Sequence, residues 1–192
     1  DLDQTLVKLP IRWNEAYKEA RERGLLRKGC WLLATMLRLK KSGHSRKAEE
    51  LHCLVEKYEV EGALKLAYDS LLVSLIYNLK KMIPGLKLAV VTKQSRKAAT
   101  IALEKLGVRK LFNVIITRED SLMRRRQIEI ISRKLGTPVH VGDSIVDVTA
   151  AVRTGAYPVL LAKNRRNVLQ GLELRIPVFH SIHKFFKSIQ SV

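Results

Sequence analysis

The chain of 192 residues carries 36 Lys and Arg against 18 Asp and Glu, a formal net charge of +18, and 46% of its residues are hydrophobic. This length fits one medium domain or a core with a small insertion, and the hydrophobic fraction is sufficient to bury a core. No apolar run reaches the roughly 18 residues that a membrane span needs, so no membrane association is expected. Cys30 and Cys53 lack metal-ligand spacing and are predicted to be core thiols in the reducing cytoplasm.

The first half of the chain is predicted to be helical after Pro10. Apolar residues recur at intervals of three and four, which predicts helices over residues 12–24, 30–41, 44–58 and 60–82. Gly24 is positioned to end the first of these helices. Four consecutive helices without an intervening strand predict a small helical bundle inserted after the N-terminal segment.

From residue 86 the pattern changes to short apolar runs that alternate with helices. The runs predict strands over residues 88–91, 114–116, 139–141, 159–161 and 178–179. Helices are predicted between and after them, over residues 95–106, 121–135, 145–153 and 181–189. This alternation predicts an α/β fold with an open parallel sheet and helices on both faces. In such sheets, ligands bind at the carboxyl ends of the strands.

Asp1 and Asp3 are the first candidate functional residues. Side chains alternate along an extended segment, so these two carboxylates point to the same side. Like charges this close repel unless a cation or a proton lies between them, which suits either Mg²⁺ or a nucleophile beside a general acid. The structural alternative is ordinary turn and capping chemistry. A nucleophile at a strand end needs that strand, so a short N-terminal β-strand directly before Asp1 is also expected.

Two further polar segments follow predicted strands. Thr92 and Lys93 come directly after one strand, and Asp143 and Asp147 come after another. Each has a structural alternative, because a Thr after a strand is often a turn residue and Asp143 and Ser144 could cap the helix that starts at Ile145. The carboxyl ends of parallel strands meet at one edge of a sheet. These segments and the N-terminal carboxylate pair are therefore predicted to form one site.

The three segments resemble motifs of the haloacid dehalogenase (HAD) superfamily of phosphotransferases in order and spacing. Asp1-Leu2-Asp3-Gln4-Thr5 is similar to the first motif, although Gln4 stands where Gly is usual. Thr92 is similar to the second motif, and Gly142-Asp143-Ser144-Ile145-Val146-Asp147 is similar to the fourth. The resemblance covers nearly the whole chain.

The resemblance implies a fold and two domains. The fold would be a HAD-like, Rossmann-type parallel sheet with helices on both faces and an additional all-helical cap domain. Residues 1–7 and 83–192 would form the α/β core, and residues 8–82 would form the cap, which in this family closes over the nucleophile and largely selects the substrate. Residues 8–82 carry no motif that is diagnostic of one substrate.

The resemblance also implies roles for the two N-terminal carboxylates. Asp1 would attack a phosphoryl group and become an aspartyl-phosphate, and Asp3 would donate a proton to the leaving oxygen and then activate water. A halide leaves without a proton, so the dehalogenase branch has no need of the second carboxylate. Asp3 therefore favours phosphoryl transfer.

The remaining residues would hold the cofactor and the phosphate. Asp143 would bind Mg²⁺ directly, and Asp147 would hold a metal-bound water or a nearby cation. The complete predicted metal set is Asp1, Asp3, Asp143 and Asp147. Thr92 would bind the phosphoryl oxygens together with backbone N–H groups at the start of the next helix, and Lys93 could add charge there.

The third motif departs from the family, which usually places a Lys before the helix that leads to the Gly-Asp motif. No Lys stands in the corresponding stretch, residues 117–126. An Arg could balance the charges instead, although its planar fork makes the exchange non-conservative. Spacing favours Arg125, with Arg124 and Arg126 as neighbours, and a solvated basic helix start is the structural alternative.

The function predicted from these motifs is a Mg²⁺-dependent phosphatase for a small phosphorylated metabolite, similar to phosphoglycolate phosphatase-like members of the family. A phosphomutase on the same residues is an alternative. A non-enzymatic module that binds nucleic acid or another polyanion through the +18 charge is a second one. Basic residues alternate with acids on most predicted helices, which favours a generally basic surface. The oligomeric state is left open.

Overall fold

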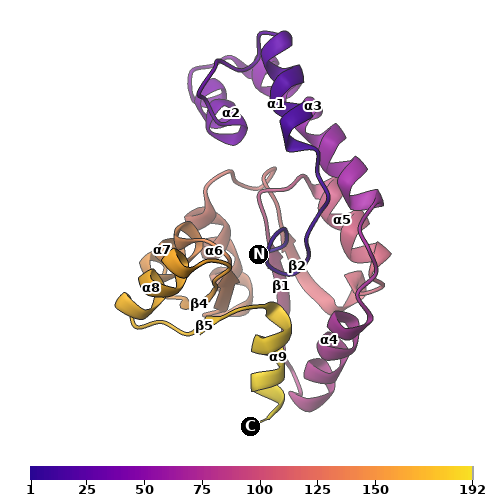
Figure 1. Cartoon of the computed structure of the whole chain (residues 1–192), viewed down its shortest axis with the longest axis vertical. Helices are drawn as coiled ribbons and strands as arrows, with labels where there is room; N and C mark the ends of the chain where they lie inside the picture. The colour runs from indigo at the N-terminus through magenta and orange to yellow at the C-terminus, as the bar shows by residue number, and fades with distance from the viewer. Residues whose placement is uncertain (192) are drawn as a thin grey trace.

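The computed structural model of the protein describes residues 1–191 and is shown in Figure 1. The first half is helical, with α1 (Trp13–Glu22), α2 (Leu32–Lys41), α3 (Ser45–Leu64) and α4 (Ser70–Met82). The second half alternates strands with helices, in the order β1 (Leu88–Val91), α5 (Arg96–Lys105), a 3₁₀ turn (Arg109–Leu111), β2 (Phe112–Ile116), α6 (Arg124–Leu135), β3 (Val139–Gly142), α7 (Ile145–Arg153), β4 (Tyr157–Leu161), α8 (Arg165–Glu173), β5 (Val178–Phe179) and α9 (Ile182–Gln190).

The main differences from the predicted elements lie at α3, α4 and α8. The helix predicted over residues 60–82 is two elements, because α3 continues to Leu64 and α4 starts anew at Ser70. The side chain of Asp69 accepts a hydrogen bond from Leu72 N at 2.9 Å and caps the new helix. Helix α8 was not predicted, although Asn164 caps it by accepting from Asn167 N.

The strands are parallel, as predicted, but they form two sheets within residues 1–191 where one was expected. One sheet pairs β1 with β2, and the other has the order β3-β4-β5. A cavity of about 640 Å³ lies between β1 and β3, and its walls are largely apolar. Helices α4, α6 and α9 also contribute residues to its lining. The amino group of Asp1 reaches the cavity and donates to the carbonyl oxygen of Val141 on β3 at 2.8 Å.

The cavity gives a test of the strand that is expected before Asp1, which stays a prediction. An extension of about five apolar residues directly before Asp1, the usual length of a strand, should raise the free energy of unfolding by at least about 2 kcal/mol. The reason is that the extension would cover apolar side chains and bond the facing edges of β1 and β3. Thermal denaturation should show a Tm higher by about 4–8 °C. A Gly-Ser extension of equal length is the control, and an equal Tm for the two extended proteins would contradict the expectation.

The apolar residues of the helical half divide between two clusters. The first cluster joins α1, α2 and the N-terminal part of α3, which we call the helical unit; its fully buried members are Ala16, Ala20, Met36, Leu51 and Val55. Helix α4 belongs to the second cluster, where Leu72 and Ile76 pack with residues of β1 and α5. Helix α4 therefore packs apart from the first cluster, and the predicted division into a core and a cap over residues 8–82 stays a prediction. In Figure 1 the helical unit lies at the upper end of the molecule and α4 at the lower end beside α9.

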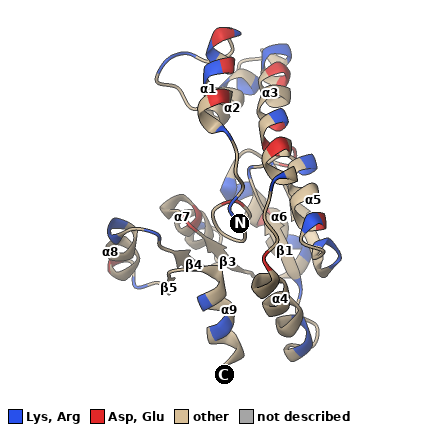
Figure 2. Cartoon of the chain, turned by 45° about the vertical axis from the view of Figure 1, so that its right-hand side comes forward, with Lys and Arg blue, Asp and Glu red and all other residues tan. Residues whose placement is uncertain are grey.

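Charged side chains are spread over most helices. Figure 2 shows Lys and Arg on the helices of both halves, with Asp and Glu among them on α1 and α3. Several pairs lie one helical turn apart, such as Arg46 with Glu50, and exposed pairs of this kind contribute little to stability. No helix within residues 1–191 combines the length and the apolar character that crossing a membrane requires. Both cysteines are free, and Cys53 is exposed, not in the core as predicted.

Candidate active site

The N-terminal loop turns back on itself at the centre of the α/β part. The amides of Leu6 and Val7 both donate to Leu2 O at 2.9 Å. Gln4, which lies between Leu2 and Leu6 in sequence, has a φ of 64°, in the left-handed region that favours glycine. This backbone conformation explains why the family that the first motif resembles usually has Gly at the position of Gln4. The side chain of Gln4 donates to Asp3 Oδ1 at 3.3 Å.

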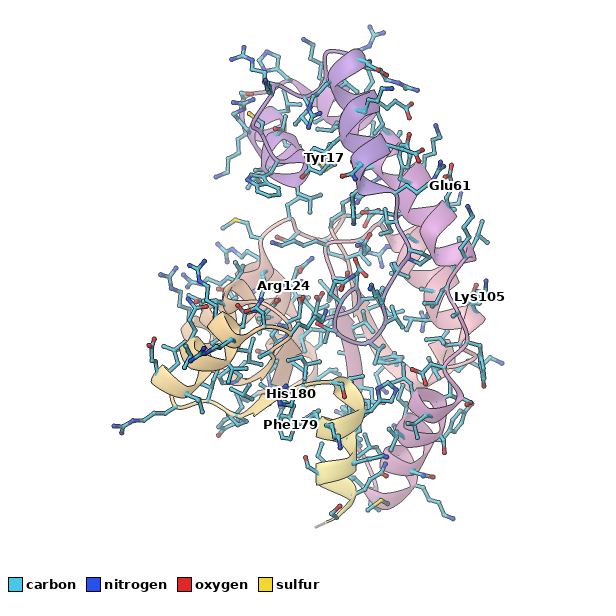
Figure 3. The ribbon with its side chains drawn as sticks, viewed as in Figure 1. Tyr17, Glu61, Lys105, Arg124, Phe179 and His180 are labelled. Carbon is cyan, nitrogen blue, oxygen red and sulfur yellow. The ribbon has the colours of Figure 1, made fainter. Side chains whose placement is uncertain are left out.

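Arg124 is the cation that the structure places among the carboxylates. Its Nη2 atom donates to Asp1 Oδ1 at 2.7 Å, and its Nε atom lies 2.7 Å from Asp147 Oδ1. Its Nη1 atom donates to Val91 O at the end of β1, also at 2.7 Å. The side chains of Asp1, Arg124 and Asp147 are all buried. Figure 3 labels Arg124, at the start of α6.

The prediction favoured Arg125 for this position, and the structure corrects it by one residue. Arg125 is exposed and pairs with Glu129 at 2.8 Å, outside the carboxylate cluster. The reason is the phase of α6, whose buried residues Ile128 and Ile131 lie four and seven positions after Arg124. Residues at this spacing share one helix face, so the apolar pattern already indicated Arg124.

Asp143 and Asp147 reach the site from the β3–α7 connection. Asp1, Asp143 and Asp147 each offer a carboxylate oxygen, and these oxygens lie within 4.8 Å of one another. Ser144 caps α7 by accepting from Asp147 N at 3.2 Å, so the capping alternative holds for Ser144. A Cβ atom on Gly142 would lie 2.4 Å from Asp147 Cβ. The glycine of the Gly-Asp pair is therefore what allows Asp147 to pack against the end of β3.

The pKa values of Asp143 and Asp147 are shifted in opposite directions. Burial raises the pKa of Asp143; the charge of Lys163 opposes this shift, and that of Asp147 reinforces it. Burial alone would also raise the pKa of Asp147, but the contact with His140 and the charge of Arg124 hold that pKa well below its usual value. Asp147 is therefore a permanent anion at neutral pH, paired with Arg124.

Asp3 lies beside the carboxylate cluster but is not part of it, although the predicted metal set included it. Its Oδ1 atom accepts from Leu9 N at 2.9 Å, and its Oδ2 atom is 3.5 Å from Gln94 Nε2. Burial raises the pKa of Asp3, against the opposing effect of the Leu9 N–H. A carboxyl group that keeps its proton to higher pH is suited to donating a proton.

Thr92 and Lys93 lie at the end of β1, as predicted. Thr92 is buried; its N–H donates to Ile116 O at 2.8 Å, and its Oγ1 atom accepts from Gln94 N at 3.1 Å. Lys93 is half-buried, and burial together with the charge of Arg124 lowers its pKa. Both side chains are therefore placed near the cluster by the carboxyl end of one strand.

The backbone N–H groups at the start of α5 are not available in the way that was predicted. Ser95 N donates to Glu59 Oε2 at 3.0 Å, Arg96 N donates to both carboxylate oxygens of Glu119, and Ala98 N donates to Ser95 Oγ. Protein groups already occupy these donors. Ser95 N, Arg96 N and Ala98 N are therefore engaged within the protein, and the phosphate-binding role predicted for Thr92 and Lys93 stays a prediction.

The prediction did not assign Lys163 or His140 to the site. Lys163 lies 3.5 Å from Asp143 Oδ2 and donates to Gln4 O. It follows β4 by two residues, so the rule that sites form at strand ends could have found it. His140 is buried in β3 with Nε2 3.4 Å from Asp147 Oδ1, and burial lowers its pKa to about 4. It is therefore a neutral partner that helps to fix Asp147.

The residues of the cluster fit a divalent cation. Carboxylate oxygens are hard donors, which Mg²⁺ prefers. Arg124 and Lys163 offset part of the negative charge of Asp1, Asp143 and Asp147, and some negative charge remains for a cation to balance. Asp143 is the most accessible of the three, because its side chain is 25% exposed, against 8% for Asp1 and 4% for Asp147.

The comparisons with known proteins agree with this geometry. Residues 30–160, more than half of the chain, match the family model described as haloacid dehalogenase-like hydrolase. This range includes Thr92, Arg124 and Asp143, whereas Asp1 and Asp3 precede it. A search of curated proteins gave no match.

Several solved structures share the fold. A haloacid dehalogenase-like family hydrolase from Streptococcus pneumoniae has a TM-score of 0.62 and 17% identity, covering 88% of this chain and 87% of its own. A HAD-superfamily hydrolase from Ehrlichia chaffeensis has a TM-score of 0.59 and 16% identity, covering 100% and 94%. The HAD-hydrolase YfnB from Bacillus subtilis, solved bound to magnesium, has a TM-score of 0.53 and 15% identity, covering 92% and 78%. With the family model matching from α2 to β4, the chain belongs to the haloacid dehalogenase-like hydrolases.

Proposed function

We propose that the protein is a Mg²⁺-dependent phosphatase that hydrolyses a small phosphorylated metabolite through an aspartyl-phosphate intermediate. The observation that carries the proposal is the position of Asp1. Its carboxylate is held by Arg124 beside Asp143 and Asp147, and Asp3, with its raised pKa, follows two residues later. In this proposal Asp1 is the nucleophile and Asp3 is the proton donor.

In the first step, a carboxylate oxygen of Asp1 attacks the phosphorus atom, and the bond from phosphorus to the leaving oxygen breaks. Asp3 gives its proton to that oxygen, so the product leaves as a neutral alcohol. Arg124 holds Asp1 Oδ1 and fixes the direction of attack. Thr92 and Lys93 bind oxygens of the transferred group from the end of β1.

In the second step, Asp3 is a carboxylate and accepts a proton from an attacking water. The water oxygen forms a bond to phosphorus, the acyl-phosphate bond to Asp1 breaks, and inorganic phosphate is released. Asp3 regains its proton in this step, so both carboxyl groups return to their starting states.

Asp1, Asp143 and Asp147 would hold the Mg²⁺ ion. When bound, the ion supplies positive charge that offsets the charge of the phosphoryl oxygens. The relative from Bacillus subtilis was solved bound to magnesium, and the donor set of this chain is of the type that Mg²⁺ prefers. The helical unit would act as the cap that encloses the substrate.

A direct test uses the purified protein with an aryl phosphate. We expect turnover with Mg²⁺, loss of turnover in excess chelator, and recovery when Mg²⁺ is added back. Binding to a nucleic-acid column, measured with the same protein, should weaken only modestly with salt, because the basic residues alternate with acids. Full activity in chelator would contradict the Mg²⁺ requirement. Absence of turnover together with a steep salt dependence of binding would favour the polyanion-binding alternative.

The role of Asp3 gives a prediction that depends on the leaving group. Asp3→Asn should still release about one equivalent of nitrophenolate from nitrophenyl phosphate in a burst, because nitrophenolate leaves without a proton, whereas an alkyl phosphate should give no burst. Rapid-quench kinetics measures the burst with both substrates. In the pH profile of the wild type, the raised pKa of Asp3 should keep the proton donor active to a higher pH than an ordinary Asp allows. Equal bursts with both substrates would rule out Asp3 as the donor.

A further inference from the structure

A buried ion pair lies outside the carboxylate cluster. Arg118 Nη1 donates to both carboxylate oxygens of Glu59, at 2.6 and 2.7 Å, and each side chain is 1% exposed. Arg118 Nε also donates to His52 Nδ1 at 3.1 Å. Burial raises the pKa of Glu59 to about 7, although Arg118 opposes this shift. Buried ion pairs contribute little to stability compared with apolar residues, so this pair invites another explanation.

The third partner of Glu59 connects it to the loop of Thr92. Glu59 Oε2 accepts a hydrogen bond from the amide of Ser95 at 3.0 Å. Ser95 is the N-cap of α5 and is fully buried. The amide of Arg118 in turn donates to Gln94 O at 3.3 Å. Glu59 and Arg118 therefore fix two adjacent residues at one end of this loop.

The other end of the loop is fixed by the α/β part of the molecule. Thr92 N donates to Ile116 O, and Gln127 Nε2 donates to Thr92 O at 2.6 Å. Lys93 lies between the two fixed ends. The conformation of the segment Thr92–Ser95 therefore depends on α6 at one end and on Glu59 at the other.

Glu59 belongs to a helix that connects two parts of the molecule. Tyr58, its neighbour on α3, packs in the cluster of the helical unit, and Ala63 packs in the cluster of β1 and α5. Figure 1 shows α3 running from the helical unit down to the side of α5. Glu59 therefore links the helix that is shared with the helical unit to the amide of Ser95.

From these contacts we propose that Glu59 is a positioning residue, through which the helical unit holds the segment Thr92–Ser95 in the conformation that binds the phosphoryl group. The inference rests on the proposed phosphatase function. It gives the buried pair a role in phosphate binding in addition to its structural contacts. It also means that a residue of α3, a helix outside the segments that were compared with the family motifs, contributes to the site.

Two double variants separate this role from a purely structural one. Glu59→Gln with Arg118→Met keeps an acceptor for Ser95 N and removes the charges, whereas Glu59→Met with Arg118→Met removes the acceptor as well. Both replace a buried ion pair by mostly apolar groups, which proteins tolerate better than one unpaired charge. The two proteins should therefore fold with similar Tm values and differ in the partner of one amide.

We expect the Gln variant to keep KM for the aryl phosphate, and the inhibition constant of inorganic phosphate, within about threefold of wild type. The Met variant should raise both by roughly 10-fold to 100-fold, because a small displacement of a binding group has effects of this size. Its kcat at saturating substrate should fall less than its kcat/KM. If either double variant is unstable, the single variant Glu59→Asp keeps both charges and should raise the same two constants, because its shorter side chain moves the acceptor away from Ser95 N.

The outcomes are distinguishable. Equal constants for both double variants and the active wild type would overturn the positioning role and leave the proposed function intact. Equal defects in both would show that charge, not the Ser95 contact, is what matters, and would also overturn it. No turnover by the wild type with Mg²⁺ would overturn the proposed function and this inference together.

Discussion

Replacing Asp1 by Asn is expected to lower kcat for an aryl phosphate by at least about 10³-fold, because the variant lacks the nucleophile of a covalent route. The asparagine side chain has almost the same size, and its oxygen can still accept the hydrogen bond that Arg124 donates at 2.7 Å. The fold should therefore survive the change. Acid quenching during turnover should trap a phosphorylated protein in the wild type and none in the variant.

The control for this experiment is Asp120→Asn. Asp120 lies outside the carboxylate cluster, where it pairs with Arg96 and accepts from Thr117 N. An Asn at this position keeps an acceptor, so activity should stay close to that of the wild type. A trapped phosphoenzyme in Asp1→Asn, or equal activity of Asp1→Asn and wild type, would contradict the covalent route.

Arg124→Ala should have the second largest effect, and Arg125→Ala is its matched control on the same helix turn. Loss of a charge directed at the reacting groups costs about 2–4 kcal/mol of transition-state stabilisation, which corresponds to a rate decrease of about 30-fold to 10³-fold. Arg125 is exposed and pairs with Glu129, so its loss should change the rate by less than about twofold. Steady-state kinetics of the two variants, side by side, gives the comparison.

Stability must be measured alongside, because Arg124 is a buried partner of Asp1 and Asp147. Removing one member of a buried ion pair can cost about 3–5 kcal/mol of unfolding free energy. Arg124→Lys keeps the charge but not the fork that spans both carboxylates, and it should fold better and recover part of the rate. Equal rates for Arg124→Ala and Arg125→Ala would show that Arg124 does not take part in the reaction.

The strand-end rule predicted where most of the candidate residues lie, because it depends on features that are local in sequence. Thr92 follows the predicted strand over residues 88–91, and Asp143 follows the predicted strand over residues 139–141 by two residues, so their places at one edge could be inferred before any contact was known. The same rule applied to β4 would have added Lys163. The choice between Arg124 and Arg125 required knowing which face of α6 is buried. The positions of Ile128 and Ile131 indicate that face, whereas the spacing between motifs does not.

Long-range packing was not predictable in the same way. Helix α4 has an apolar stripe like those of its neighbours, and nothing in that stripe says which cluster Leu72 and Ile76 will join. The division of the strands into two sheets depends on which edges meet, and the apolar runs are equally compatible with one sheet. The Glu59–Arg118 pair joins residues 59 positions apart, a separation at which sequence pattern carries no signal.

The continuity of α3 through both clusters has a consequence for protein engineering. A chimaera that takes its helical unit from a relative needs its crossover point within this helix. The position of that point decides which contacts of α3 and α4 remain native. A crossover before Tyr58 retains the native Glu59 and its contact with Ser95. A crossover at the end of α4 would also exchange Leu72 and Ile76, which belong to the α/β cluster, so the graft would have to match two foreign surfaces at once. With the helical unit as the proposed cap, substrate selectivity should be transferable with the first crossover and be lost together with stability in the second.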